Sequence, residues 1–371
     1  MSASVRPRTT RRYLFDSLYF SADILISDWM RRFAQWRLMR GIKVDKEFYR
    51  SYREDVLPYW KQYGVKPKKS FCKLEYMRKG RLDPRSVPNN IHHRYVVPYF
   101  DNPIFIKSLT DKNLHSLLFP DVKRPETIFK RSGGCYCNDN FTPIPEEEAC
   151  RRLEQPGRFI VKPARFTGGG SHIEFIDGPL EHAAAQALLQ KWADAEYIVQ
   201  RIIVQHPSLN EFSDTSVNTM RVETLVFHGE AHILSAVLRI GKRGSRVDNT
   251  AQGGYLALIR PDGTLDRRAF TERNGDTDFQ YIEQTDEGKR FEDFAVPSWE
   301  KVRDTALDLA LKLPQLKLIG WDLAVDEAGD VVLIEYNCHF APNQDELCGP
   351  LFGDMTDEVL AEVFASKKLR L

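Results

Sequence analysis

The feature that most constrains this chain is a series of apolar, strand-forming runs between residues 197 and 337. Val, Ile, Leu and aromatic residues dominate each run, and the turn-forming stretches HGEA, DGT and DEAGD separate several of them. One stretch, Trp299–Leu313, has helical spacing instead. Strands joined by short turns pair antiparallel, so this half predicts a large antiparallel sheet with helices packed against it. The runs are YIVQRIIV, RVETLVF, AHILSAVLRI, GYLALI, LIGWDLAV and VVLIEYN.

The rest of the chain has different patterns, and the whole predicts an α+β protein with three regions. Residues 1–100 form a basic region that is largely helical and partly irregular, residues 101–197 alternate strands with helices, and residues 198–371 carry the large sheet. Apolar residues recur at three- and four-residue steps near the N-terminus, at Ile24, Ile26, Trp29, Phe33, Trp36 and Leu38.

Charge is distributed unevenly along the chain. The net charge is +1, yet Met1–Arg81 holds 20 Lys and Arg against 8 Asp and Glu. The N-terminal helix either packs on its own protein or lies as a basic amphipathic element on a membrane surface or partner. No base-reading or stacking motif accompanies the charge, so nucleic-acid binding is not expected. No segment has the roughly 20 apolar residues of a membrane span. Six cysteines lack a repeated CxxC spacing, which predicts reduced thiols and a cytoplasmic location.

Three oxygen-bearing side chains interrupt the last two strand-like runs. Glu335 and Asn337 are two positions apart, so they project from the same face of a strand. A turn of two or four residues at EAGD places Asp322 directly opposite Glu335. Facing carboxylates repel unless a cation lies between them, and oxygen ligands favour Mg²⁺, with Mn²⁺ as an alternative. Exposed acids at two strand ends are the other interpretation of these residues alone.

A second motif lies in FIVKPARFTGGGSHIEFI. Lys162 ends a strand, and Gly168, Gly169, Gly170 and Ser171 follow it. Consecutive glycines let backbone N–H groups surround an anion, and the lysine adds positive charge. A flexible hairpin tip explains the glycines equally well. Together with the carboxylate pair, however, the motif indicates a site for Mg·ATP.

Several stretches, from about Asp101 to the C-terminus, resemble the sugar-transfer-associated ATP-grasp family. This resemblance implies two α/β lobes that grip ATP between them. Its motifs are TDKNLHSLLFPDVKRPETIFKR, VQHPSLNEFSDTSVNTMRVETL, HILSAVLRIGKRGSRVDNTAQGG, LKLIGWDLAVDEAGDVVLIEYN and GPLFGDMTDEVL.

The resemblance implies roles for individual residues on the nucleotide side. Lys112 and Lys162 would contact the ATP phosphates, and Gly168–Ser171 would close over them. The segment from Gln200 to Ile203 would link the lobes, with its backbone reading the adenine edge and Ile203 flanking the ring. Gln200 stands where Glu is common. The ribose-binding residue stays open among Gln205, His206 and Ser208.

The resemblance also implies roles for residues around the reacting groups. Asn218 belongs to the nucleotide-binding set, and Arg221 and Arg239 would hold the transferred phosphate, which a planar guanidinium matches in bidentate fashion. Asn249 would lie near the acceptor. Asp322, Glu335 and Asn337 match the metal ligands of the family.

The function implied is an ATP-dependent carboxylate–amine ligase that works through an acyl phosphate and releases ADP and phosphate. Its small-molecule substrates would belong to polysaccharide or sugar-conjugate biosynthesis, with a sugar acid or amino sugar as one partner. Two alternatives remain open, a kinase acting on a sugar-type hydroxyl and a non-catalytic nucleotide-binding scaffold. The basic N-terminus would allow peripheral contact with the inner face of a membrane.

Overall fold

The computed structural model of the chain describes residues 29–30, 33–34, 36–39, 43–165, 172–272, 279–338, 340 and 344–366. Two compact units form, one from Met1–Pro103 together with Ala341–Leu371, and the other from Ile104–Phe340. The glycine-rich residues 168–171 lie outside the described residues.

The smaller unit is helical in its described part, as the sequence predicts for the N-terminal region. The Tyr59 hydroxyl donates to Asp357 at 2.7 Å, and the buried Trp60 ring packs edge-on against Phe364. Its helical segments, two of them π-helical turns, are α2 (Lys46–Ser51), η1 (Tyr52–Val56), α3 (Leu57–Lys61), α4 (Lys69–Lys79), α5 (Asn89–Ile91), η2 (His92–Val96), α6 (Val97–Phe100), α12 (Asp345–Cys348), η6 (Gly353–Met355) and α13 (Thr356–Ala365).

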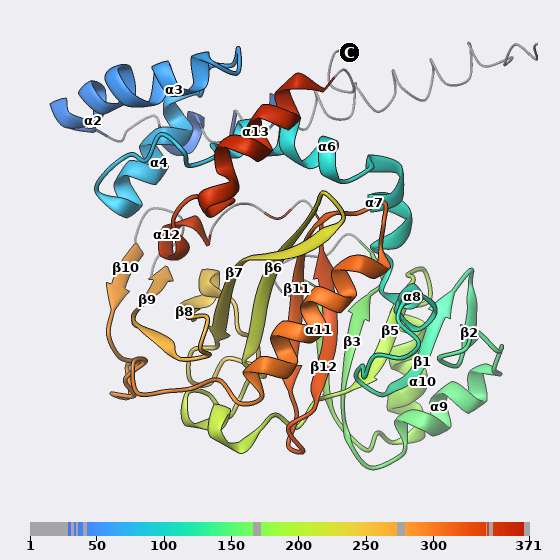
Figure 1. Cartoon of the computed structure of the whole chain (residues 1–371). Coiled ribbons are helices and arrows are strands. Elements are labelled where there is room, and N and C mark those ends of the chain that lie inside the picture. The colour runs from blue at the N-terminus through green and yellow to red at the C-terminus, as the bar shows by residue number, and fades with distance from the viewer. Residues whose placement is uncertain are drawn as a thin grey trace, which may run out of the picture. The chain divides into compact units, whose positions relative to one another are not determined.

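A seven-stranded antiparallel sheet dominates the larger unit and confirms the predicted fold class. Helix α11 (Trp299–Lys312) lies across one face of it (Figure 1) and buries Val302, Ala306 and Leu309 there. In spatial order the strands are β10 (Phe279–Ile282), β9 (Leu265–Glu272), β8 (Tyr255–Ile259), β7 (Glu230–Ile240), β6 (Thr219–Phe227), β11 (Leu318–Val325) and β12 (Val331–Asn337).

A five-stranded antiparallel sheet forms the second layer of strands in the same unit. Helices α9 (Glu146–Leu153) and α10 (His182–Lys191) pack on it, and Leu153, Leu189 and Phe159 belong to the shared apolar core. Its strands are β2 (Cys135–Cys137), β1 (Thr127–Ser132), β5 (Tyr197–Arg201), β3 (Arg158–Pro163) and β4 (Glu174–Asp177). The remaining short helices are α7 (Pro103–Leu109), η3 (Lys112–Leu114), α8 (His115–Leu118), η4 (Pro207–Glu211) and η5 (Thr250–Gln252).

The hairpin of β11 and β12 differs from the expected turn but keeps the expected pairing. Val325 pairs with Val331, so the loop has five residues rather than two or four. That length alone would place Asp322 out of line with Glu335. A β-bulge between Leu323 and Asp322 shifts the register by one residue, with Ile334 as the extra residue, and brings Asp322 opposite Glu335.

Among the residues that the structure describes, no helix combines the length and the apolar composition needed to traverse a bilayer.

The larger unit buries one histidine among aromatic rings. His115 lies with its ring centroid 5.2 Å from that of Tyr336 and 6.2 Å from that of Phe119. Burial lowers its pKa from the ordinary 6.5 to about 3, with the neighbouring lysines adding to the effect. The folded protein therefore holds this imidazole in its neutral form at all pH values near neutrality.

This buried histidine predicts a loss of stability in weak acid. Since the folded-state pKa is depressed, its contribution is fully present above the unfolded pKa and falls as pH drops towards 3. Between pH 7.5 and pH 5 one such histidine costs about 2 kcal/mol of unfolding free energy. Urea unfolding of His115→Gln should show a shallower pH dependence than wild type. His232→Gln, at a partly exposed position on β7, is the control, and an equal change in both variants would contradict the prediction.

Candidate nucleotide and metal site

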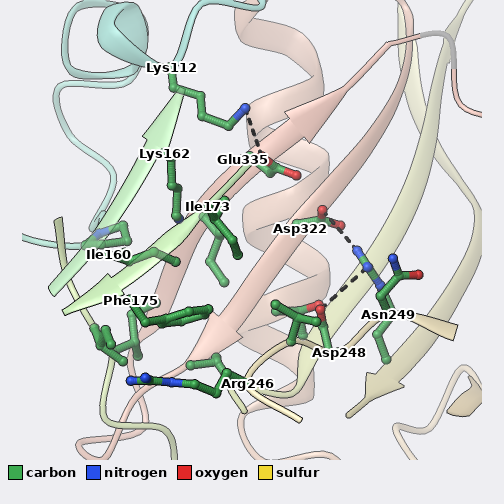
Figure 2. A pocket seen from close by; sticks show the side chains of 18 of the residues that line it. Lys112, Ile160, Lys162, Ile173, Phe175, Arg246, Asp248, Asn249, Asp322 and Glu335 are labelled. Atoms are coloured by element: carbon green, nitrogen blue, oxygen red, sulfur yellow. Dashed lines mark hydrogen bonds and ion pairs between the residues drawn. The ribbon is translucent and has the colours of Figure 1, made fainter. Parts of the chain in front are cut away.

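A cavity of about 190 Å³ lies in the larger unit, between side chains of its two sheets. Figure 2 shows Lys112 and Glu335 at one end, Phe175 and Arg246 at the other, and Asp322 to one side. Cationic side chains outnumber the three acidic ones, Asp248, Asp322 and Glu335, so the lining favours an anionic ligand. The cationic residues are Lys112, Lys162, Arg201, Arg221, Arg239 and Arg246.

Asp322 is the most buried charge of this lining, with 3% of its surface exposed. Arg221, directly opposite on β6, donates through Nε and through Nη2, the latter at 2.9 Å. Arg239 Nη1 lies 3.3 Å away, and the Asn337 amide donates at 3.2 Å. Burial alone would raise the pKa of Asp322, but the charges of Arg221 and Arg239 outweigh it and hold the pKa below its usual range. The carboxylate is therefore ionised at neutral pH.

Gly320 makes room for the Arg221 side chain. A Cβ atom at this position would lie 3.1 Å from Arg221 Cδ and 3.5 Å from a ring carbon of Phe340. Gly320 precedes Asp322 by two residues, so the two positions share one face of β11. The guanidinium thus crosses from β6 over a position without a side chain and reaches Asp322.

Two lysines face the second carboxylate. Lys112 Nζ lies 3.4 Å from Glu335 Oε2. Lys162, on β3 of the other sheet, has its pKa lowered to about 8, first by burial and also by Lys112, while Glu335 acts in the opposite direction. Two cations therefore lie near Glu335, and they are the two lysines for which the family resemblance predicts contact with the ATP phosphates.

The donor set around Asp322 and Glu335 matches a hard divalent cation. The two carboxylates stand directly opposite each other. Asn337 is two positions from Glu335 on β12, so both side chains lie on the same face, and both line the cavity. In the part of the chain that the structure describes, no three His, Cys, Asp or Glu side chains gather into a metal-binding group. Carboxylate and amide oxygens without His or Cys suit Mg²⁺ rather than zinc.

Apolar side chains predominate at the other end of the cavity, where Arg246 also lies. Ile160 and Phe175 come from the five-stranded sheet, Ile203 follows β5, and Ile334 is the bulged residue of β12. The bulge allows Ile334 and Glu335, which are neighbours in sequence, to line the same cavity. An apolar slot beside a cationic end suits a flat base attached to phosphates.

Several predicted residues lie elsewhere. Gln200 is buried in β5 between Thr127 and Ile160, and it is not a lining residue. Asn218 is also buried outside the lining, where its amide donates to Gln205 Oε1 at 3.1 Å and to two backbone carbonyls. The open ribose candidate Gln205 belongs to this same structural network.

The structure also brings into the lining several side chains for which the sequence predicted no role. Asp248 pairs with Arg239 at 3.5 Å and accepts a hydrogen bond from the Thr219 hydroxyl. Phe175 and Arg246 complete the apolar end. Asp248 precedes the predicted Asn249 and Thr219 lies two residues before Arg221, so both had a signal in their neighbours. Phe175 and Arg246 lie within two of the quoted motifs, FIVKPARFTGGGSHIEFI and HILSAVLRIGKRGSRVDNTAQGG, but nothing in the spacing of those motifs assigned either residue a role.

The two carboxylates should differ in what their removal does to stability. Asp322→Asn leaves Arg221 buried without its bidentate partner and should cost about 3 kcal/mol of unfolding free energy. The Glu335 side chain is 26% exposed and pairs with Lys112, so Glu335→Gln should cost less than about 1 kcal/mol. Chemical denaturation of both variants without ligand measures the difference. Equal losses would show that Asp322 is not the buried charge that holds the arginines.

A family model described as sugar-transfer associated ATP-grasp matches residues 91–344. Among solved structures, D-alanyl-alanine synthetase A from Vibrio cholerae O1 biovar eltor is similar at 12% identity and a TM-score of 0.41, over 69% of this chain and 65% of that chain. The ATP-grasp ligase PsnB, solved with a minimal precursor, has 15% identity and a TM-score of 0.38, over 74% and 67%. An L-amino acid ligase from Bacillus licheniformis has 11% identity and a TM-score of 0.37, over 69% and 47%.

The chain therefore spans less than two thirds of the length of the Vibrio and Bacillus enzymes. No curated protein matches it.

Proposed function

Because the chain belongs to the sugar-transfer associated ATP-grasp family, we propose that it is an ATP-dependent carboxylate–amine ligase that works through an acyl phosphate. The observation that carries this proposal is the lining of the cavity. An excess of cations surrounds two facing carboxylates at one end, and apolar side chains form the other. That combination suits the phosphates, the metal and the base of Mg·ATP.

The proposed first step is phosphoryl transfer. A substrate carboxylate oxygen attacks the γ-phosphorus of ATP, ADP leaves, and an acyl phosphate forms. Asp322, Glu335 and Asn337 would hold Mg²⁺, which would neutralise phosphate charge when bound. Arg221 and Arg239 present guanidinium groups to the same cavity and would stabilise the charge on the transferred phosphate.

In the proposed second step a neutral amine attacks the acyl carbonyl, the C–O bond to phosphate breaks, and the proton lost from the nitrogen leaves with the phosphate. Asn249 lines the cavity beside Asp248, whose carboxylate would hold the incoming ammonium and accept the proton that it loses before the attack. Catalysis would rest on positioning and charge neutralisation, with no covalent protein nucleophile. The sugar-related part of the proposal, a sugar acid or amino sugar as one substrate, rests on the family's description alone.

Mg²⁺-dependent ATP binding tests the site without knowledge of the other substrates. Calorimetry should detect ATP binding to wild type in the presence of Mg²⁺. The Kd for ATP should rise about tenfold or more after Glu335→Gln. Glu230→Gln, on exposed β7 surface, is the matched control and should bind as wild type does. A folded wild type that binds no ATP would overturn the proposal.

Hydroxylamine separates ligation from phosphorylation of a hydroxyl. It captures an acyl phosphate as a hydroxamate, whereas a phosphate ester does not react. Incubation with Mg·ATP, hydroxylamine and a panel of uronic and amino acids should therefore yield a hydroxamate together with ADP. ADP release with a stable phosphate ester in its place would identify a kinase instead.

We also propose that the basic N-terminal region contacts an anionic membrane surface. Trp29, Phe33 and Trp36 are each more than half exposed, and Trp29 stacks on Phe33 at 5.9 Å between ring centroids. The four- and three-residue steps place these rings on one helix face. Exposed aromatic rings in a region with a large excess of Lys and Arg are typical of helices that lie in a membrane interface.

Co-sedimentation of the full chain with vesicles tests this surface. Binding to vesicles rich in phosphatidylglycerol should exceed binding to neutral phosphatidylcholine vesicles and should weaken as salt is raised. The triple variant Trp29→Ser, Phe33→Ser, Trp36→Ser should lose most of it. Equal recovery of wild type and the triple variant with anionic vesicles would contradict the proposed surface.

A further inference from the structure

Arg246 joins the two sheets at the apolar end of the cavity. It lies between β7 and β8 of the seven-stranded sheet, whereas its partners Phe175 and Asp177 lie on β4 of the five-stranded sheet. Its Nη1 and Nη2 atoms donate to the two carboxylate oxygens of Asp177 at 3.0 and 2.8 Å. The guanidinium carbon is 4.5 Å from the centroid of the Phe175 ring, and Figure 2 shows the two side chains lying along each other.

The contacts of Arg246 with Asp177 and Phe175 connect the opposite sheet to the hairpin of β3 and β4, which forms one wall of the cavity. This hairpin carries Ile160, Lys162, Ile173 and Phe175, all of which line the cavity. The position of the hairpin relative to the opposite wall therefore sets how far its lining side chains lie from those of the seven-stranded sheet. Arg246 contacts the hairpin through both a lining residue and the last residue of β4.

The cavity has a volume of about 190 Å³, and the β3–β4 hairpin supplies four of its lining side chains. Movement of the hairpin away from the opposite wall therefore enlarges the space open to a ligand. Since Arg246 bonds to one wall and belongs to the other, separation at this end breaks its contacts with Asp177 and Phe175.

The bonds of Arg246 suit a contact that breaks and re-forms. Asp177 is 63% exposed and Arg246 is 35% exposed, so water competes for both charges. The hydrogen bonds from Arg246 are the first cause that lowers the pKa of Asp177 below its ordinary value. The carboxylate is therefore ionised at neutral pH and available to the guanidinium at every closure.

We propose that Arg246 is a positioning residue that fastens the β3–β4 hairpin over a bound nucleotide and so sets how long the nucleotide stays. The inference rests on the proposed ATP site and adds a residue outside the phosphate and metal contacts. Its action is indirect, through Asp177 and Phe175. Loss of either Arg246 or Asp177 would therefore have the same consequence.

Arg158, the second partner of Asp177, offers a control within the same hairpin. Arg158 Nε on β3 lies 3.3 Å from Asp177 Oδ1 and belongs to the same sheet as its partner. Arg158→Gln removes an exposed ion pair from the same carboxylate but leaves the connection between the sheets intact. Arg246→Gln removes the connection between the sheets.

Stopped-flow dissociation of a fluorescent N-methylanthraniloyl ATP analogue, chased with unlabelled ATP in the presence of Mg²⁺, measures the fastening directly. We expect Arg246→Gln and Asp177→Asn each to raise the dissociation rate about three- to tenfold. The double variant should be no faster than either single variant. Arg246→Lys, which keeps the charge but not the paired donors, should be intermediate, and Arg158→Gln should match wild type. High salt should reduce the difference between wild type and Arg246→Gln.

Three results would overturn the inference. Dissociation from Arg246→Gln that is no faster than from Arg158→Gln would exclude a role of Arg246 in retaining the nucleotide. A fast Arg246→Gln beside an unchanged Asp177→Asn would mean that Arg246 contacts the nucleotide directly. A wild type that fails to bind the analogue would overturn the proposed function, and this inference with it. The first two results would leave the proposed function intact.

Discussion

The buried carboxylate of Asp322 is the charge on which the arrangement of this site depends. Every residue of β11 is buried, so an ionised side chain in the middle of that strand requires partners from its neighbours. β6 supplies Arg221, β7 supplies Arg239, and β12 supplies Asn337. The same guanidinium groups that neutralise the carboxylate also match phosphate oxygens. One carboxylate thus holds in place the groups that the proposed reaction needs.

The pairing of Asp322 with Glu335 shows what a sequence pattern can and cannot predict. Alternation along two strands joined by a short turn is enough to place the two carboxylates opposite each other. It does not reveal the five-residue loop or the bulge at Ile334, because two compensating shifts leave the predicted pair unchanged. The bulge nevertheless matters for the site, since it brings Ile334 into the cavity beside Glu335.

Other features of the site cannot be predicted from the sequence, for different physical reasons. Asn218 and Gln205 are polar residues near a strand end, and such residues look alike whether they bind a ligand or hold a loop. In the structure they hydrogen-bond to each other and to backbone groups. The contact between Arg246 and Asp177 joins residues far apart in sequence, so no local spacing predicts it. The large sheet was predictable because each of its strands carries its own pattern.

The cations of the cavity give a physical reason to expect that ligand binding and the proposed closure are coupled. Lysines and arginines from two sheets approach one space, and three carboxylates offset only part of their charge. Burial lowers the pKa of Lys162 to about 8 and the charge of Lys112 adds to the effect, whereas the cavity's carboxylates act in the opposite direction. In the proposed site a polyanion between the sheets would add negative charge beside these cations and so favour a closed arrangement. If the proposed opening takes place, we expect weak and exposed contacts such as that of Arg246 with Asp177 to yield first.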